Sequence, residues 1–305
     1  MLSDDFERYI ALRRSMGARL ERPRHYLLSY ARFAEARGEH HIRTQTALEW
    51  ARTAPTPGAR YERLSRLALA AKFLRAENTA HEIPPAHLLA IRRTRSIPYI
   101  YAPEELVRIL DAAREIAWWT RCVLYRQVYV TLFGLIAATG LRVSEALDLR
   151  LDDVLPGGIL RIRKAKYGKS RLVPLHPSVR EALDAYLALR RTVAVESDRL
   201  FLSAKGRALT YPTVNGAFHS VLRRANIAPD RPKAPRIHDL RHTFATRVLG
   251  QGKADRRSIA RRTVALMTYM GHENPRYTYW YLQATPELMA DIATAAEALI
   301  AGGGQ

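Results

Sequence analysis

The chain has 305 residues, a length that suits two domains better than one, and 48% of them are hydrophobic, as in an ordinary globular protein. Its 49 lysine and arginine residues outnumber 29 aspartate and glutamate residues, which gives a formal net charge of +20. This excess favours a polyanionic partner, because each phosphate that a Lys or Arg neutralises releases condensed counterions. The single cysteine, Cys122, excludes an internal disulfide and a cysteine-based zinc site. Composition therefore predicts a nucleic-acid-binding protein, with a merely basic protein as the alternative.

Neither export nor membrane insertion is predicted. Residues 1–5 are acidic and lack the apolar core of a signal peptide. The longest apolar run, about 128–138, is too short to span a bilayer. A chain with one cysteine also suits a reducing compartment. We therefore expect a cytoplasmic protein with no role in the membrane.

Residues 1–90 are predicted to form a helical domain. Tyr26, Tyr30 and Phe33 recur at i, i+4 and i+7, and a later helix is expected over 60–75, where leucines and alanines share one side. Helix-breaking residues separate these segments: Gly17, Pro23, Gly38 and the run 55–58. Four short helices with basic outer faces predict a small four-helix bundle.

Residues 91–101 are predicted to be a basic linker between two domains. The surrounding stretch, 78–101, has no helical periodicity and contains three prolines. Its arginines, Arg92, Arg93 and Arg95, are either solvated or lie along a phosphate backbone. Both interpretations stay open, and we name these residues as candidate DNA contacts.

Residues 102–305 are predicted to form a second domain of mixed structure. The stretch 159–164 alternates apolar and basic residues and predicts a strand, and 171–175 returns as a second strand after a turn at 167–169. The basic residues of this hairpin are further candidate DNA contacts: Arg161, Arg163 and Lys169. Helices are expected at 103–116, 120–138, 144–149, 177–190, 211–225, 238–249, 255–268 and 285–300. The expected class is mainly α with a small β-hairpin or sheet (α+β).

The second domain carries residue clusters that suit phosphodiester exchange. That reaction needs a nucleophile, cations on the non-bridging oxygens and an acid for the leaving oxygen. A buried helix is expected to end at Gly140, and Arg142 follows where the next helix begins, with Glu145 three residues on. A helix start and an arginine fork both favour phosphate. The alternative is a surface ion pair between Arg142 and Glu145.

A second cluster lies in a predicted helix. His238 and Arg241 are one turn apart on the same face, so both can address one phosphate. A metal site built from His238, His242 and His272 is disfavoured, because no carboxylate or cysteine completes the ligand set at a helix-turn spacing. We expect neither a metal ion nor a cofactor.

Two further clusters are ambiguous when each is taken alone. A lysine of the predicted hairpin, Lys164, Lys166 or Lys169, can reach into a nearby site and donate a proton, or it is simply solvated. His272 stands nine residues before Tyr281 in an aromatic segment, and such segments more often belong to a core.

Together the clusters resemble the tyrosine recombinase and phage integrase family. The family carries, in order, an Arg in a Gly-Leu-Arg-x-Ser-Glu stretch, a hairpin Lys, His-x-x-Arg, Gly-His and a Tyr. The matching positions here, within about 98–300, are Arg142, Lys166, His238, Arg241, His272 and Tyr281. The family's spacing selects Lys166 by its distance from Arg171, and Tyr281 by its distance from His272, with Tyr279 as the fallback. The N-terminal segment matches the family's core-binding domain only in position and helical character.

The resemblance implies a role for each residue. Tyr281 would attack the scissile phosphate to form a 3′-phosphotyrosyl link, and His238 would take its proton. Arg142 and Arg241 would hold the non-bridging oxygens, with Glu145 orienting a cationic partner. Lys166 would protonate the leaving 5′ oxygen, and His272 would hydrogen-bond the phosphate.

The resemblance also implies partners and a setting. We expect the two domains to clamp double-stranded DNA, and a homo-oligomer, a tetramer in synapsis, to perform the exchange, with or without a partner recombinase. The similarity is greatest to stand-alone recombinases of bacterial mobile elements and to those that resolve chromosome dimers, which implies a nucleoid-associated protein. The apolar stripe of the expected last helix either packs in its own domain or docks on a neighbouring protomer.

Three other functions remain as alternatives. A type IB topoisomerase uses the same chemistry without synapsis, and an accessory homologue with an inactive site would only bind DNA. A basic RNA-binding protein is a third, although the chain lacks an RNP-type aromatic strand and a GXXG loop. The DNA site and the outcome of recombination are not encoded in any motif that we identify.

Overall fold

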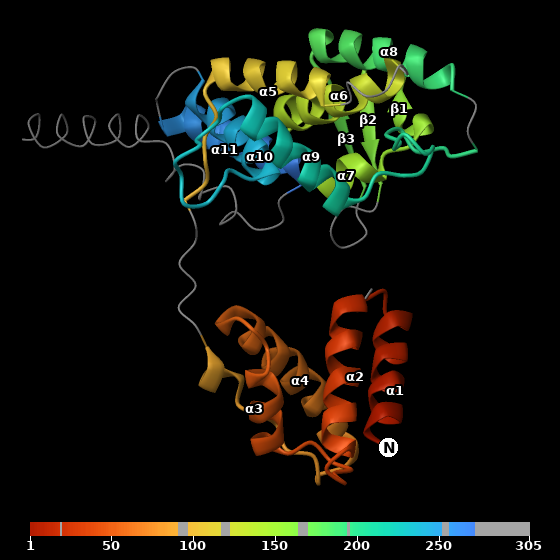
Figure 1. Ribbon diagram of the computed structural model, residues 1–305, viewed down its shortest axis with the longest axis vertical. Helices are drawn as coiled ribbons and strands as arrows, with labels where there is room; N and C mark the ends of the chain where they lie inside the picture. The colour runs from red at the N-terminus through yellow and green to blue at the C-terminus, as the bar shows by residue number, and fades with distance from the viewer. Residues whose placement is uncertain are drawn as a thin grey trace, which may run out of the picture. The chain divides into compact units, whose positions relative to one another are not determined.

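The chain divides into two compact units, Met1–Arg95 and Ser96–Gln305 (Figure 1). The computed structural model describes residues 1–18, 20–90, 97–116, 123–163, 170–193, 196–251 and 256–271. Within these ranges, no helix is both long and apolar enough to cross a membrane. The expected class, mainly helical with a small sheet, is confirmed.

The first unit is built from helices. They are α1 (Leu2–Ser15), α2 (Glu21–Glu35), α3 (Thr44–Arg52) and α4 (Pro57–Glu77), followed by the short 3-10 helix η1 (Ala86–Leu89). Helix α4 starts earlier than the expected 60–75, because the Thr56 hydroxyl accepts a hydrogen bond from the amide of Ala59 and Pro57 fits the first helical position. Phe6, Tyr30 and Trp50 pack edge to face at the centre of the unit.

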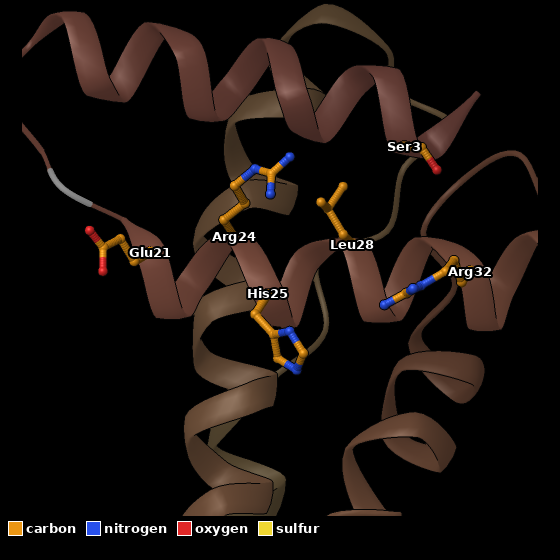
Figure 2. Close-up of a pocket in the computed structure, with 6 residues that line it drawn as sticks. All are labelled: Ser3, Glu21, Arg24, His25, Leu28 and Arg32. Atoms are coloured by element: carbon orange, nitrogen blue, oxygen red, sulfur yellow. The ribbon is translucent and has the colours of Figure 1, made fainter. Parts of the chain in front are cut away.

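A polar hollow opens beside α2 of this unit (Figure 2). Arg24, His25 and Arg32 line it along successive turns of α2, together with Glu21 and Leu28 and with Ser3 of α1. His25 and Arg32 are exposed, whereas the guanidinium of Arg24 is hydrogen-bonded to the carboxylate of Glu7. The hollow is therefore lined by both basic and acidic side chains, because Glu21 is exposed as well.

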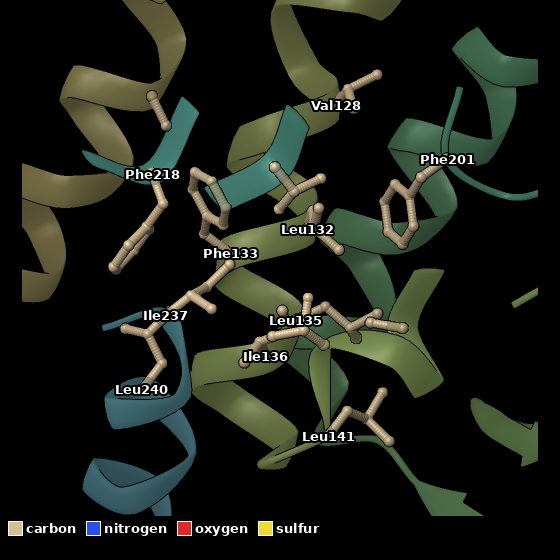
Figure 3. Packing of buried hydrophobic residues seen from close by; sticks show 14 of the residues in the cluster. Val128, Leu132, Phe133, Leu135, Ile136, Leu141, Phe201, Phe218, Ile237 and Leu240 are labelled. Atoms are coloured by element: carbon tan, nitrogen blue, oxygen red, sulfur yellow. The ribbon is translucent and has the colours of Figure 1, made fainter. Parts of the chain in front are cut away.

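The second unit is organised around α6 (Val123–Thr139). Further helices are α5 (Pro103–Glu115), α7 (Val143–Asp148), η2 (Leu151–Asp153), α8 (Pro177–Arg191), α9 (Tyr211–Arg224), α10 (Ile237–Gly250) and α11 (Arg256–Met270). Helix α6 is apolar around most of its surface because α5, α8 and α10 all pack against it. In Figure 3, Phe133 of α6 meets Phe218 of α9 edge to face, with Ile237 and Leu240 of α10 below them. The helix expected at 285–300 lies outside the described residues.

A small antiparallel sheet covers part of this unit. Its strands β1 (Val154–Leu155), β2 (Ile159–Ile162) and β3 (Arg171–Pro174) pair in that order, with Leu160 opposite Val173. Leu160 and Ile162 are buried, as the alternating pattern predicts. The sequence interpretation missed β1, because two residues are too few to show a period of two. The turn expected at 167–169 lies outside the described residues.

The chain that enters the second unit is attached directly to α10. The amide of Tyr101 donates to the Thr243 hydroxyl at 3.0 Å, and Arg247 donates to the Tyr101 carbonyl at 3.2 Å. The Tyr101 ring is buried, and its hydroxyl lies 3.4 Å from the carbonyl of Arg236. These bonds fix the position of the helix that carries His238 and Arg241.

Candidate active site

Helix α10 begins with a firm N-terminal cap. The amide of Arg236 donates to the buried carboxylate of Asp239 at 2.8 Å, and the Arg236 guanidinium pairs with the same carboxylate at 2.9 Å. The carboxylate also interacts favourably with the positive end of the helix dipole. His238 lies in this first turn and Arg241 lies one turn later, as the sequence predicts.

Arg241 joins α10 to two other elements from a buried position. Its side chain is only 1% exposed. One terminal nitrogen donates to the carbonyl of Gly140, after α6, and the other donates to the carbonyl of Met270, at the end of α11, at 3.2 Å. These two hydrogen bonds fix the guanidinium between the end of α6 and the end of α11.

Two features of position 140 require glycine: its backbone conformation and the close approach of a neighbouring ring. Its φ of +62° lies in the left-handed region, where a side chain is strained. A Cβ at this position would also overlap the ring of Phe244 on α10. The missing side chain therefore allows α10 to approach closely enough for Arg241 to reach the Gly140 carbonyl.

Arg142 stands at the start of α7. Its amide donates to Oε2 of Glu145 at 2.9 Å and its guanidinium to Oε1 at 2.6 Å. A second guanidinium nitrogen lies 3.5 Å from the carbonyl of Gly271. The side chain is 27% exposed, so an incoming anion can reach it. The pair that the sequence left open as a surface contact is thus partly buried and faces the end of α11.

Glu145 is a buried carboxylate shared between two guanidinium groups. Arg171 binds it in a two-pronged geometry, with nitrogen–oxygen distances of 3.0 and 2.9 Å, while Arg142 binds it from the start of α7. Burial alone would raise the pKa of Glu145, but the hydrogen bonds and charges of Arg171 and Arg142 outweigh it and lower the pKa to about 2. Glu145 is therefore ionised near neutral pH.

Arg171 was not among the predicted site residues, yet it is central to this arrangement. Besides holding Glu145, its Nε donates to the carbonyl of Tyr269 at 2.9 Å. The sequence offers one signal for it, a basic residue at the first position of the return strand beside the hairpin lysines. Nothing in that pattern indicates that the side chain turns toward Glu145 rather than toward solvent.

His238 and His242 occupy successive turns of α10 with their rings perpendicular and 4.9 Å apart. The pKa of His238 is lowered to about 4, first by desolvation where protein surrounds the ring and then by the charges of Arg241 and Arg236. Burial and the neighbouring His238 lower the pKa of His242 to about 4 as well. Both imidazoles are thus neutral near pH 7, and a neutral imidazole can accept a proton.

The described residues include no grouping of three or more His, Cys, Asp and Glu side chains that could hold a metal ion. Several predicted residues lie outside the described ranges, and the structure does not place them: Lys166, His272, Tyr281, Arg92, Arg93, Arg95 and Lys169. Gly271, whose carbonyl faces Arg142, directly precedes His272 in the sequence. The structure thus brings together Arg142, Glu145, His238 and Arg241.

Arg161 and Arg163, two candidate DNA contacts, have local partners on the sheet. Arg161 donates to the buried carboxylate of Asp153 at 3.0 Å, and Arg163 bonds to Asp153 and Asp152. Burial would raise the pKa of Asp153, but its bonds to Arg163 and Arg161 lower it. Both arginines thereby have a structural role in the sheet, which does not depend on a nucleic acid.

Comparison with known proteins identifies the family. The family model described as phage integrase family matches residues 100–287, more than half of the chain. The chain is 37% identical to a putative integrase/recombinase, y4rB, of Sinorhizobium fredii over 93% of both chains. It is 31% identical to the tyrosine recombinase XerD of Rhizobium meliloti, over 75% of this chain and 71% of that one. The chain therefore belongs to the phage integrase family, the tyrosine recombinases.

Solved structures show the same fold. The Tn1549 transposon integrase in complex with transposon right-end DNA aligns with a TM-score of 0.66 at 18% identity, over 97% of this chain and 99% of that one. The site-specific recombinase XerH, bound to its palindromic difH substrate, aligns with a TM-score of 0.63 at 22% identity, over 90% of this chain and 78% of that one. The family, the fold and the class of enzyme that the sequence predicts are confirmed.

Proposed function

We propose that this protein recombines DNA at specific sites by cutting and rejoining strands through a transient 3′-phosphotyrosyl link. The observation that carries the proposal is the convergence of Arg142, His238 and Arg241 at one place. Arg241 bonds the carbonyl of Gly140, two residues before Arg142, from a position 101 residues further along the chain. Two cations and a neutral imidazole at one point are the groups that phosphoryl transfer to a tyrosine requires.

The proposed reaction uses these groups together with three residues outside the described ranges. The Tyr281 hydroxyl attacks the scissile phosphorus and gives its proton to His238, while the bond from phosphorus to the 5′ oxygen breaks. Lys166 protonates that oxygen, and His272 donates a hydrogen bond to the phosphate. Arg142 and Arg241 stabilise the charge on the non-bridging oxygens in the transition state. Attack by the 5′-hydroxyl of another strand reverses the step and completes the exchange.

The lowered pKa of His238 supports its assignment as the base. Free tyrosine has a pKa near 10, so its hydroxyl needs a proton acceptor at neutral pH. Desolvation, together with the charges of Arg241 and Arg236, lowers the pKa of His238 and keeps its ring unprotonated before DNA binds. A phosphate in the site would offset those positive charges and raise the pKa of His238, which would make it a stronger base when it is needed.

Double-stranded DNA is the proposed substrate, clamped between the helical unit and the catalytic unit. The net charge of +20 supports a phosphate-facing surface on the protein. The solved structures of XerH and of the Tn1549 integrase are complexes with DNA. We propose a tetramer in synapsis, with or without a partner recombinase, acting at the bacterial nucleoid to integrate, excise or transpose a mobile element.

The test is the formation of a covalent adduct. Wild-type protein and the variants Tyr281→Phe and Tyr279→Phe are incubated with a supercoiled plasmid that carries the DNA from either side of the gene. We expect SDS-resistant protein–DNA adducts from the wild type and from Tyr279→Phe, and none from Tyr281→Phe, although all three proteins bind DNA. An adduct from Tyr281→Phe would move the nucleophile to another tyrosine. Relaxation of the plasmid without joined products would indicate a topoisomerase, and binding without any adduct an accessory protein.

A further inference from the structure

Three arginine side chains converge on the last turn of α11. Arg171 donates to the carbonyl of Tyr269, Arg241 to that of Met270, and Arg142 approaches that of Gly271. The last carbonyls of a helix have no partners within the helix and carry its negative dipole end, so guanidinium groups are well suited to them. Each arginine comes from a different element: β3, α10 and the start of α7.

Arg171 is linked to Arg142 through a shared carboxylate. It makes a two-pronged bond to Glu145, which in turn holds the amide and the guanidinium of Arg142. Its side chain is 12% exposed, so it is largely enclosed by the protein. Gly271 has a φ of +65°, and a Cβ there would lie 3.1 Å from a terminal nitrogen of Arg171. The chain at Gly271 thus passes directly over the Arg171 guanidinium.

We propose that Arg171 is a positioning residue of the active site, which acts through Glu145 to set both the place and the effective charge of Arg142. The proposal rests on the function proposed above, in which Arg142 holds the scissile phosphate. The same guanidinium fixes the end of α11 through Tyr269. Arg171 itself has no role in touching the DNA.

The physical reason is the sharing of one carboxylate by two cations. With Arg171 present, the negative charge of Glu145 is divided between two guanidinium groups. Without Arg171, the whole charge of Glu145 falls on Arg142 in a partly buried place, where Coulomb interactions are strong. Arg142 would then be drawn toward Glu145 and would stabilise the transition state less, even though the DNA still binds through its many other phosphates.

The test compares two kinds of scissile linkage. Arg171→Met keeps the apolar stem but removes the charge, and Arg171→Lys keeps a charge but not the two-pronged fork. Arg190→Met is the matched control, because Arg190, near the end of α8, is 2% exposed and donates to the carbonyls of Ser197 and Arg199 beyond that helix. For each protein, the DNA dissociation constant and the first-order rate of adduct formation at saturating DNA are measured. The scissile linkage is either an ordinary phosphodiester or an uncharged methylphosphonate.

We expect Arg171→Met to form adducts about 100-fold more slowly on the phosphodiester, the usual effect of losing one donor to a developing anion, while DNA affinity is unchanged. On the methylphosphonate the decrease in the rate of adduct formation should be only roughly 10-fold or less. That linkage lacks one anionic oxygen, so its cleavage depends less on Arg142. Arg171→Lys should be intermediate. Arg190→Met should lower the unfolding temperature but cleave both linkages in the wild-type ratio.

Two results would overturn the proposal. If the rate of adduct formation by the Arg171 variants falls by the same factor on both linkages, Arg171 merely supports the fold. If they cleave as fast as the wild type, Arg171 has no role in positioning. In both cases the wild type still forms the adduct, so the proposed function stands. If the wild type forms no adduct on either linkage, the proposed function fails and the role of Arg171 fails with it.

Discussion

At the scale of single residues, the charge of the site depends on the groups to which its arginines are bonded. Arg241 is bonded to neutral carbonyls, whereas Arg142 shares a carboxylate with Arg171. The carboxylate of Glu145 offsets part of the charge of Arg142 and Arg171. The described part of the site therefore has more positive than negative charge, which suits a phosphate.

The titration of His238 reports this charge directly. In the free protein its imidazole should titrate with a midpoint near pH 4, as measured from the carbon-bound ring protons by NMR, because desolvation and the charge of Arg241 disfavour the imidazolium. Since His242 also has a lowered pKa and lies next to His238, the observed midpoints belong to the pair of rings rather than to either ring alone. Binding of DNA by the Tyr281→Phe variant should move the midpoint upward. A midpoint near 6.5 in the free protein, unchanged by DNA, would contradict this electrostatic account.

Glu145 should make the free energy of unfolding depend on pH. Its pKa in the folded protein, about 2, is below the value of 4.5 of an unperturbed Glu, so its contribution is fully present above about pH 5 and is lost as the pH falls toward 2. A shift of that size corresponds to about 3 kcal/mol. Glu145→Gln should be less stable than the wild type at pH 7, and the difference should narrow in acid. The measurement is denaturant unfolding at pH 7, 5 and 3.

Asp184→Asn is the control for Glu145, because Asp184 is an exposed carboxylate 3.5 Å from Arg180 on α8. An exposed pair of this kind contributes little to stability. The free energy of unfolding of Asp184→Asn should therefore equal that of the wild type at each pH. If Glu145→Gln also followed the wild type, the ion pairs of Glu145 would not stabilise the folded state.

At the scale of elements, the site lies where the ends of several elements meet. The end of α6, the start of α7, the start of β3 and the end of α11 are held together by side chains of Arg142, Arg171 and Arg241. Because the ends of helices have unpaired backbone groups, this is where polar side chains can make the largest number of bonds to the main chain. Loss of one junction should therefore affect the others.

The junction of α6 with α10 can be tested at Gly140. Gly140→Ala combines the strain of a positive φ with an overlap against Phe244, whereas Gly157→Ala has a φ of +81° and open space around it. The control should cost about 1 kcal/mol of unfolding free energy from the backbone alone. Gly140→Ala should cost about 1–3 kcal/mol more from the overlap, and it should also slow adduct formation. Equal losses in the two variants would show that the close approach of Phe244 does not matter.

At the scale of the whole molecule, the net charge of +20 dominates association with DNA. Affinity for a duplex should fall about 10³–10⁵-fold between roughly 50 and 200 mM salt, if about 6–10 phosphates are contacted. Fluorescence anisotropy with labelled duplex measures the slope of log affinity against log salt. Tyr281→Phe should keep the wild-type slope, and Arg142→Ala should reduce it by about one. A shallow slope would mean that much of the positive charge lies away from the DNA.

Much of this protein is determined by local sequence patterns. The alternation through Leu160 and Ile162 specifies which face of β2 is buried, and the spacing of His238 and Arg241 places both on one side of α10. The order of the motifs is enough to identify the family. Such features can be predicted from the sequence, because helical and strand periodicities depend only on neighbouring residues and on which side of an element faces the core.

Only the tertiary structure determines which residues these side chains contact. The contacts of Arg171 with Glu145, 26 residues away, and of Arg142 with Gly271, 129 residues away, arise from the packing of separate elements. The depth of Arg241, the strand β1 and the requirement for Gly140 likewise follow from what lies next to them in space. A sequence can specify the types of residue and the faces of the elements, but the choice of partner depends on packing, because every arginine has the same donors wherever it stands.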